Sequence, residues 1–194
     1  TRYGDDGTGT IATLCVRRVA ESTENPEKWG FCSNFLCDSK PGDEIQLTGP
    51  SGRVTLLPES TLDKDIIMVA TGTGVAPFRS FWRRLLVENT PAATAFNGNL
   101  WLLLGIPNQE SIPYADEIAD LKMNHSNQFK VDYALSRQST NKSGGKMYVQ
   151  DKIEELSDEL FEKLDKGAHI YFSGLKRMMP GILETLERVA TNKG

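Results

Sequence analysis

Small and hydroxyl-bearing residues follow a short apolar stretch near residue 70, and their types suit phosphate binding. The apolar stretch is residues 66–70 (IIMVA), and the segment after it reads Thr71-Gly72-Thr73-Gly74-Val75-Ala76-Pro77. Glycines let a backbone turn tightly and approach a ligand, while hydroxyls and the free N–H groups of a helix start donate to phosphate oxygens. We therefore expect a pyrophosphate site here. The segment is neither GxGxxG nor a P-loop with its lysine, so a plain structural turn is the alternative.

A second polar set follows another strand candidate, residues 129–135. Its members supply a hydroxyl, two cations, an aromatic ring and an amide: Ser136, Arg137, Lys146, Tyr148 and Gln150. A 2′-phosphate on an adenine ribose needs a hydroxyl and a planar guanidinium, and adenine stacks on an aromatic face. A site for NADH would instead carry an acidic residue that contacts the ribose hydroxyls. The set predicts a preference for NADPH over NADH, with an ordinary solvated loop as the alternative.

Alternating strand and helix patterns must position both sets. A continuous apolar run predicts a buried parallel strand at residues 66–70, and residues 100–106, 129–135 and 169–172 are further strand candidates. Helical spacing of apolar residues occurs at residues 77–87, 114–123, 153–164 and 179–190. This alternation predicts an α/β domain at residues 61–194, with a doubly wound parallel sheet covered by helices on both faces. Ligands of such sheets bind beyond the carboxyl ends of the strands.

The first 60 residues have a different pattern, typical of β structure. Strand candidates are residues 10–19, 43–47 and 54–57. Residues 32–37 (CSNFLC) could form one or two helical turns, and residues 49–52 (GPSG) predict a tight turn. We expect residues 1–60 to form part of an antiparallel barrel.

Composition excludes several classes of function. The formal net charge of −4 argues against a nucleic-acid binder. The longest apolar runs are far shorter than the roughly 20 residues that span a bilayer. The chain has three cysteines, Cys15, Cys32 and Cys37, which form no CxxC pair, and only two histidines. Neither a disulfide framework nor a metal site is therefore expected. The sequence as given has no secretory signal pattern, and a removed targeting peptide is compatible with it.

Three segments resemble those of plant-type ferredoxin–NADP reductases in order and spacing. They are TGTGVAPFRSF, ALSRQSTNKSGGKMYVQ and YFSGLKRMMPGI, and the resemblance extends back through LTGPSG, GFCSNFLCD and LCVRR to TRYGDDG. It implies an FAD-binding barrel followed by a five-stranded NADP-binding domain. The implied activity is electron transfer from reduced ferredoxin through FAD to NADP(+), and the implied location is the plastid stroma or the thylakoid.

The resemblance also implies roles for individual residues. Segments similar to Cys15-Val16-Arg17 and Gly30-Phe31-Cys32-Ser33 hold FAD in this family. The pyrophosphate and nicotinamide end of NADP would face Thr73, Gly74, Val75 and Pro77. The 2′-phosphoadenosine end would be held by the five residues of the second polar set, with Gly174 and Leu175 lining the adenosine side.

Departures from the family pattern give a second hypothesis. Ser173 stands where the family has a cysteine beside the nicotinamide, and Arg177 stands where it has glycine. Ser173, as the candidate catalytic residue, would hold the ring less well for hydride transfer. The family's upstream Arg-x-Tyr-Ser flavin segment and its C-terminal tyrosine segment have no counterpart in the sequence as given. The alternative is therefore a weakened or non-catalytic NADPH-binding or structural member of a larger assembly, and a related flavin or oxygenase reductase is a third, weaker reading.

Basic residues offer a docking face for a protein partner. They are Arg17, Arg18, Lys40, Arg83 and Arg84. Ferredoxin, an acidic electron carrier, is the expected partner, with flavodoxin and a thylakoid-associated complex as further candidates. Ordinary solvated surface charge is the alternative reading.

Overall fold

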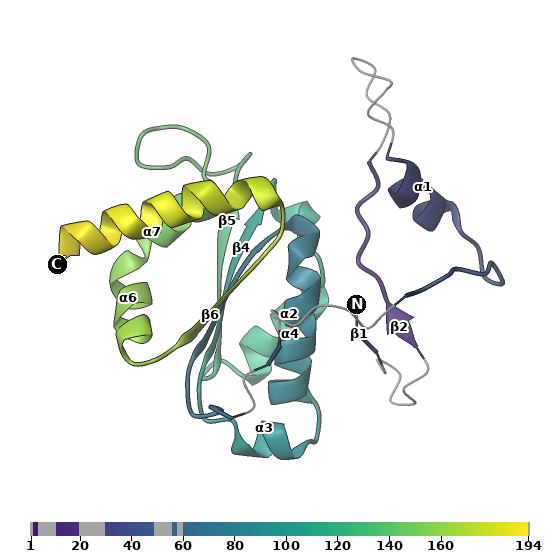
Figure 1. Cartoon of the computed structure of the whole chain (residues 1–194), viewed down its shortest axis with the longest axis horizontal. Helices are drawn as coiled ribbons and strands as arrows, with labels where there is room; N and C mark the ends of the chain where they lie inside the picture. Colours follow the sequence, from purple (N-terminus) through teal and green to yellow (C-terminus); the bar gives the residue numbers. More distant parts are fainter. Residues whose placement is uncertain (1, 4–10, 20–29, 49–55, 58–59, 194) are drawn as a thin grey trace. The chain divides into compact units, whose positions relative to one another are not determined.

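The computed structural model describes residues 2–3, 11–19, 30–48, 56–57 and 60–193. The chain divides into two compact units, Thr1–Leu56 and Leu57–Gly194 (Figure 1). No helix in the described part of the chain is both long and apolar enough to cross a membrane.

A parallel sheet forms the centre of the second unit. Its strands are β3 (Ile66–Thr71), β4 (Leu100–Ile106), β5 (Phe129–Leu135) and β6 (His169–Ser173). They lie in the order β5-β4-β3-β6, and all three neighbouring pairs are parallel. The parallel sheet is confirmed, but the five strands expected are four in the described residues. The residue pattern predicts four strands here, and the fifth is implied by the resemblance alone.

The strand order creates a switch point between β3 and β6. The chain proceeds from β3 to β4 to β5 in one direction, then returns across the sheet to place β6 on the other side of β3. The connections on the two sides of β3 therefore cover opposite faces. A crevice for ligands forms where the connections from two adjacent strands diverge in this way, at their carboxyl ends.

One face of the sheet is covered by the connections that follow β3 and β4. They contain α2 (Ala76–Trp82), the π-helical turn η3 (Arg83–Val87), α3 (Pro91–Ala95), the short helix η4 (Gln109–Ser111) and α4 (Ala115–Asn124). Ile66, Met68 and Ala70 of β3 pack on this side with Phe78 and Trp82 of α2. The expected helix at residues 77–87 is thus α-helical only to Trp82, and the expected helix at 114–123 is α4.

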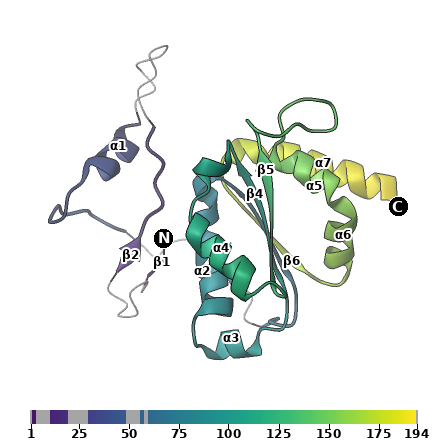
Figure 2. The ribbon, with the colours of Figure 1, turned by 180° about the vertical axis from the view of Figure 1, so that it is seen from behind.

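The other face is covered by helices from later in the chain. They are α5 (Val149–Glu155), α6 (Ser157–Asp165) and α7 (Met179–Lys193), with a short turn η5 (Lys176–Met178) before α7. Ile67 and Val69, which alternate with the β3 residues of the first face, pack on this side. Figures 1 and 2 show the two helical layers on either side of the sheet. The expected single helix at residues 153–164 is divided at Leu156, which packs against this second cluster.

The first unit has little regular structure in its described residues. β1 (Arg2–Tyr3) pairs antiparallel with β2 (Ala12–Thr13), and α1 spans Phe31–Asp38, as expected for residues 32–37. The strand expected at residues 10–19 is wrong beyond Thr13, and residues 43–47 form no strand. Most of the turn and strand expected at residues 49–57 lies outside the described residues.

Asp65 fixes the amino-terminal edge of the sheet, just before β3. Its carboxylate accepts hydrogen bonds from the backbone N–H of Asn99 at 2.8 Å, from the Asn99 side chain at 3.0 Å and from Lys163 Nζ at 2.7 Å. Burial acts to raise the pKa of Asp65, but the hydrogen bonds from Lys163 and Asn99 outweigh it and lower the pKa below its ordinary value. The ionised carboxylate therefore stabilises the fold.

We expect Asp65→Asn to lower the free energy of unfolding at neutral pH by about 1–3 kcal/mol. Because the folded-state pKa is depressed, this contribution is complete above the unfolded pKa of about 4 and is lost as the pH falls through the folded-state value. Urea unfolding from pH 7 to pH 3 measures both effects. Asp63→Asn is the control, since Asp63 is exposed and lies 3.4 Å from Lys64. Equal pH dependence in the wild type and both variants would contradict the assignment.

Candidate functional site: the crevice between β3 and β6

Thr71 and Ser173 end the two strands that border the crevice. The hydroxyl of Thr71 donates to the sulfur of Met178 at 3.1 Å and accepts a weaker hydrogen bond from the Leu175 N–H at 3.4 Å. These contacts tie the loop after β6 to the end of β3. Ser173 is half-buried, whereas Gly174 and Leu175 are exposed. The loop therefore presents its backbone and the Leu175 side chain at the carboxyl edge of the sheet.

Two glycines allow the loops to approach closely. A Cβ on Gly74 would overlap the carbonyl oxygen of Ser173 and lie 2.6 Å from the Cα of Gly174. A Cβ on Gly174, whose φ is +152°, would overlap the Thr71 hydroxyl. Both positions require glycine, so the loops after β3 and β6 pack backbone against backbone at Gly74, and the Thr71 hydroxyl and Met178 sulfur lie beside Gly174. Glycine turns of this kind leave backbone N–H groups open to a pyrophosphate.

The predicted phosphate-binding residues take different places in this loop. Thr73 and Gly74 lie in the short helix η2 (Gly72–Val75), and Thr73 is half-buried. Pro77 lies in the first turn of α2, as expected for a residue without an N–H. Val75 is fully buried in the core, so it can face a ligand only through its backbone.

Ser136 and Arg137 leave the carboxyl end of β5 in a fixed direction. Their backbone N–H groups donate to the carbonyl oxygens of Ile106 at 3.0 Å and Pro107 at 2.8 Å. The chain thus continues beside the end of β4, while Ser136 is half-buried and Arg137 exposed. In the described part of the chain, the Arg137 guanidinium has no acidic or hydrogen-bonding partner, so it is available to an anion.

A folded-back loop brings Lys146 and Tyr148 to the same edge. Lys146 pairs with Thr140 in an antiparallel bridge, and the Met147 N–H donates to the Ser139 carbonyl at 3.2 Å. Met147 is 7 % exposed, and its two neighbours are exposed. The alternation of an extended segment therefore turns Lys146 and Tyr148 outward while Met147 anchors the loop.

Gln150 connects this set with the loop after β6. It lies in the first turn of α5, and a Cβ on Gly181 of α7 would come within 3.6 Å of its amide nitrogen. The absence of a side chain at Gly181 lets α5 and α7 approach here. Gln150 thus lies beside the start of α7, the helix that follows the β6 loop.

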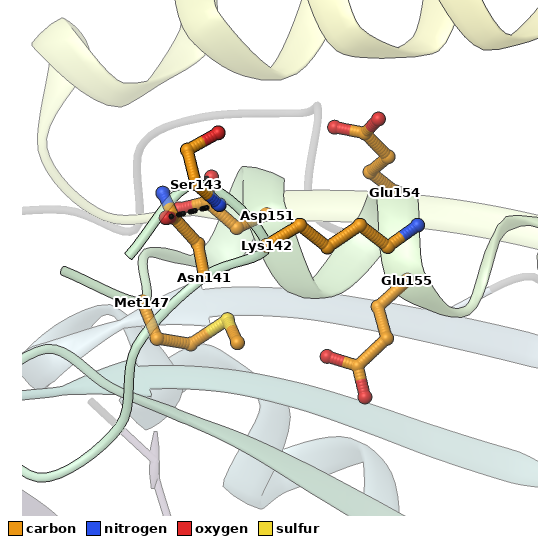
Figure 3. A pocket seen from close by; sticks show the side chains of 7 residues that line it. All are labelled: Asn141, Lys142, Ser143, Met147, Asp151, Glu154 and Glu155. Carbon is orange, nitrogen blue, oxygen red and sulfur yellow. Dashed lines mark hydrogen bonds between the residues drawn. The ribbon is translucent and has the colours of Figure 1, made fainter. Parts of the chain in front are cut away.

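Carboxylates of α5 line a pocket between this helix and the loop that carries Lys146 (Figure 3). Its lining residues are Asn141, Lys142, Ser143, Met147, Asp151, Glu154 and Glu155. Lys142 extends toward Glu154 and Glu155 in this view. Hydrogen bonds from Arg188 hold the pKa of Glu154 below its ordinary value. The pocket is therefore anionic, unlike the outer side of the same loop.

An ion-pair cluster that was not predicted from the sequence lies between α2 and α4. Arg79 Nε donates to both carboxylate oxygens of Glu117 at 3.0 Å, and the Trp82 indole N–H donates to the same group at 3.3 Å. Burial acts to raise the pKa of Glu117, but these hydrogen bonds outweigh it and lower the pKa. Glu117 is thus an ionised structural anchor. Two helices covering one face were the available signal, but the sequence does not show which polar side chains meet.

The proposed docking residues of the second unit do not project freely. Arg83 and Arg84 are both half-buried, and Arg83 Nε lies 4.0 Å from Glu88. Arg17, Arg18 and Lys40 of the first unit are exposed. The exposed basic residues of the predicted docking face therefore belong to the first unit.

Near the predicted flavin residues of the first unit, Ser33 and the buried Asn34 bond to the backbone, and Asn34 was not predicted from the sequence. Cys15 and Val16 are half-buried and Arg17 is exposed. The Ser33 hydroxyl accepts from the Val19 N–H at 3.1 Å and donates to the Gly30 carbonyl at 2.9 Å. Asn34, 2 % exposed, donates to the Val19 carbonyl at 2.8 Å and accepts from Arg18 at the same distance.

Residues at the start of α1 are otherwise open. Phe31 is 83 % exposed, and Cys32 is exposed as well. Gly30 precedes the helix, and a Cβ there would lie 2.5 Å from the Ser33 hydroxyl and 2.6 Å from the Val19 side chain. The segment ending at Val19 and the start of α1 thus form one local unit, with the Ser33 hydroxyl already engaged by the backbone.

Comparisons with known proteins agree on one family. The model of the oxidoreductase NAD-binding domain matches residues 68–184. The chain is 58 % identical over its whole length to ferredoxin–NADP reductase root isozyme 2 of Arabidopsis thaliana, and 54 % identical to the Chlamydomonas reinhardtii ferredoxin–NADP reductase. It spans about half the length of these relatives, 52 % and 56 % respectively.

Solved structures show the same likeness. Ferredoxin–NADP reductase of Plasmodium falciparum with 2′P-AMP has a TM-score of 0.70 and 26 % identity, over 82 % of this chain and 62 % of the other. Its H286L mutant, also solved with 2′P-AMP, has a TM-score of 0.70 and 28 % identity, over 81 % of this chain and 60 % of the other.

Proposed function

Because this chain belongs to the oxidoreductase NAD-binding family, in its plant-type ferredoxin–NADP reductase branch, we propose that the whole protein passes electrons from reduced ferredoxin through FAD to NADP(+), giving NADPH. The relatives that match over the whole chain carry this name. Their chloroplastic names support a plastid location. Flavodoxin as a second carrier, and the stroma or a thylakoid complex as the finer location, belong to the same proposal.

The observation that carries the proposal is the combination of a close glycine contact between the loops after β3 and β6 and an exposed 2′-phosphate set. Gly74 and Gly174 bring backbone to the switch point without side chains. Arg137, Lys146 and Tyr148 are exposed at the carboxyl edge of the same sheet. A plain structural turn at residues 71–77 would not explain the exposed polar set. An ordinary solvated loop at residues 136–150 would not explain the close glycine contact.

Each set has a distinct part in binding. Bound FAD and NADP supply the redox chemistry, in which a hydride passes between the flavin and nicotinamide rings. The N–H groups and hydroxyl of the Thr73–Gly74 turn would donate to the pyrophosphate. Arg137 and Lys146 would neutralise the 2′-phosphate, Ser136 would donate to it, and Tyr148 would stack on adenine. Gln150, Gly174 and Leu175 would line the adenosine between them.

Ser173 would stand beside the reacting nicotinamide. It ends β6 at the crevice, opposite Ala70 in the strand register. Holding the ring in one orientation lowers the barrier to hydride transfer. Ser173 and the exposed Arg177 favour the second candidate, a weakened or non-catalytic NADPH-binding member of the family acting within a larger assembly.

The flavin half of the proposal concerns residues 1–60. We propose that they contribute to an antiparallel FAD-binding barrel and that residues 61–194 form the NADP-binding domain. Cys15, Val16, Arg17, Gly30, Phe31, Cys32 and Ser33 would hold FAD. The exposed start of α1 supports an anion site, since the first N–H groups of a helix have no partner within it.

The test is made on the complete natural protein. Its flavin absorbance, its affinity for NADPH and NADH and its rate of ferredoxin-dependent NADP(+) reduction are measured together. Bound flavin with turnover supports the reductase. A colourless protein that still binds NADPH would support the second candidate, and failure to bind NADPH would overturn both.

Arg137→Ala is expected to weaken NADPH binding by roughly 10-fold to 100-fold, because it removes charge-assisted hydrogen bonds to a phosphate. NADH affinity should stay within about twofold, since NADH lacks the 2′-phosphate. Titration of both nucleotides checks the result. Lys142→Ala is the matched control, a cation further along the same loop whose side chain extends toward Glu154 and Glu155. An equal loss for both nucleotides would contradict the assigned role.

A further inference from the structure

One carboxylate holds the start of the helix that follows Tyr148. Asp151 lies in the first turn of α5, and its Oδ2 accepts from the Tyr148 N–H at 2.8 Å. Its other oxygen, Oδ1, accepts from the Asn141 side-chain nitrogen at 3.1 Å. Asp151 thus connects the helix start with a residue ten positions earlier, and the two side chains meet in the pocket of Figure 3.

Asn141 in turn shapes the tip of the loop. Its side-chain oxygen accepts from the N–H groups of Ser143 at 3.1 Å and Gly145 at 2.8 Å. Its backbone N–H donates to the Gly145 carbonyl at 2.9 Å. The amide of Asn141 has a defined orientation as a result, because its oxygen serves the turn and its nitrogen serves Asp151.

Lys146 and Tyr148 lie between these two fixed points. Met147, 7 % exposed, anchors the segment from the opposite side. The turn at Asn141 sets one end of the segment, and the bond from Tyr148 to Asp151 sets the other. The directions of the two exposed side chains are therefore determined before any ligand binds, which lowers the ordering cost of binding.

We propose that Asp151 and Asn141 are positioning residues for the 2′-phosphoadenosine end of NADP(H), an inference that rests on the proposed function. They act through the backbone that carries Lys146 and Tyr148, and neither is assigned a contact with the nucleotide. A carboxylate near a phosphate site opposes binding by charge. The geometric role and the electrostatic role of Asp151 consequently predict opposite signs when its charge is removed.

A reciprocal exchange tests the proposal. Asp151→Asn sets two amide nitrogens against each other, or forces Asn141 to rotate and release Ser143 and Gly145. Asn141→Asp sets two carboxylates against each other. The double variant Asn141→Asp/Asp151→Asn can restore every hydrogen bond, with the donor now on the side of residue 151 and the net charge unchanged.

The probe is 2′-phospho-AMP, titrated into the full protein and each variant. We expect each single variant to bind about tenfold more weakly and the double variant to bind within about twofold of the wild type. Thermal unfolding of each protein verifies that the variants compared are folded. Glu155→Gln is the charge control, since it removes a carboxylate from the same pocket, where Glu155 contacts Lys152 at 2.9 Å.

The outcomes separate the two proposals. Folded single variants that bind like the wild type, or more tightly, would overturn the positioning role. A double variant no better than the single variants would overturn it too, because restored hydrogen bonds would then have no effect. A wild-type protein that does not bind 2′-phospho-AMP would contradict the proposed function itself, and this inference with it.

Discussion

Ser173→Cys in the complete protein is expected to speed hydride transfer between NADPH and FAD by about 10-fold to 100-fold. Ser173 ends β6 at the crevice, is half-buried and lies beside the Gly74 turn. The resemblance to plant-type reductases implies a cysteine at this position. The substitution would therefore return a sulfur to the place where the nicotinamide is proposed to lie.

The expected gain follows from hydration and contact. Within the described residues the half-buried Ser173 hydroxyl has no hydrogen-bond partner, so it is left to bind water. A thiol is less hydrated and more polarizable, and it can pack against the ring without retaining water. Each tenfold in rate corresponds to about 1.4 kcal/mol of transition-state stabilisation, and we expect one to two such steps.

Stopped-flow reduction of the flavin by NADPH measures the hydride step directly. Ser173→Ala separates the two causes, because it removes the hydroxyl without adding sulfur. An alanine variant as fast as the cysteine variant would assign the effect to hydration. Equal rates in the wild type and both variants would contradict a place for Ser173 beside the nicotinamide. NADPH affinity is measured as the control for binding.

The parallel sheet could be predicted because its central strands are buried on both faces and therefore consist of consecutive apolar residues. Residues 66–70 and 100–106 are such runs. The first forms β3, which extends one residue further to Thr71, and the second forms β4 with the predicted bounds. The site could be located for a related reason. Residues that directly follow parallel strands gather at one edge of the sheet, which brings Thr73, Arg137 and Ser173 to the same side of the domain.

Polar partners could not be predicted, since periodicity indicates a face and not a contact. Asp151 is a surface-type residue in the sequence, and only the folded loop brings it to Asn141 and the Tyr148 N–H. Glu117 is separated from Arg79 by 38 positions and meets it because two connections cover the same face. These contacts depend on loop conformation, which apolar spacing does not encode.

The first unit shows how side-chain capping can override strand propensity. Branched residues at 10–19 predict a strand, but pairing ends at Thr13. Further along, the backbone of Val19 bonds to the side chains of Ser33 and Asn34. Hydrogen bonds from short polar side chains compete with strand ladders in this way.

Gly74→Ala is expected to lower the free energy of unfolding by about 2–3 kcal/mol and to weaken NADPH binding by at least about tenfold. The added methyl group would meet the Ser173 carbonyl oxygen and the Gly174 Cα, which are backbone atoms and cannot rotate away. The two loops would have to separate. Separation moves the N–H groups of η2 away from the proposed pyrophosphate position and strains the contacts of Thr71 with Met178 and Leu175.

Gly72→Ala is the matched control in the same turn. Gly72 has a φ of +54°, and nothing lies within 4 Å of its added Cβ, so alanine would cost only the strain of a left-handed backbone, about 1 kcal/mol. Urea unfolding ranks the two variants, and NADPH titration of the folded proteins measures the crevice. If Gly74→Ala is no more destabilising than Gly72→Ala, the loops can part without cost and the crevice is not held by close packing. A larger loss at Gly74 alone, in both stability and affinity, means that the same backbone contact closes the fold and shapes the site.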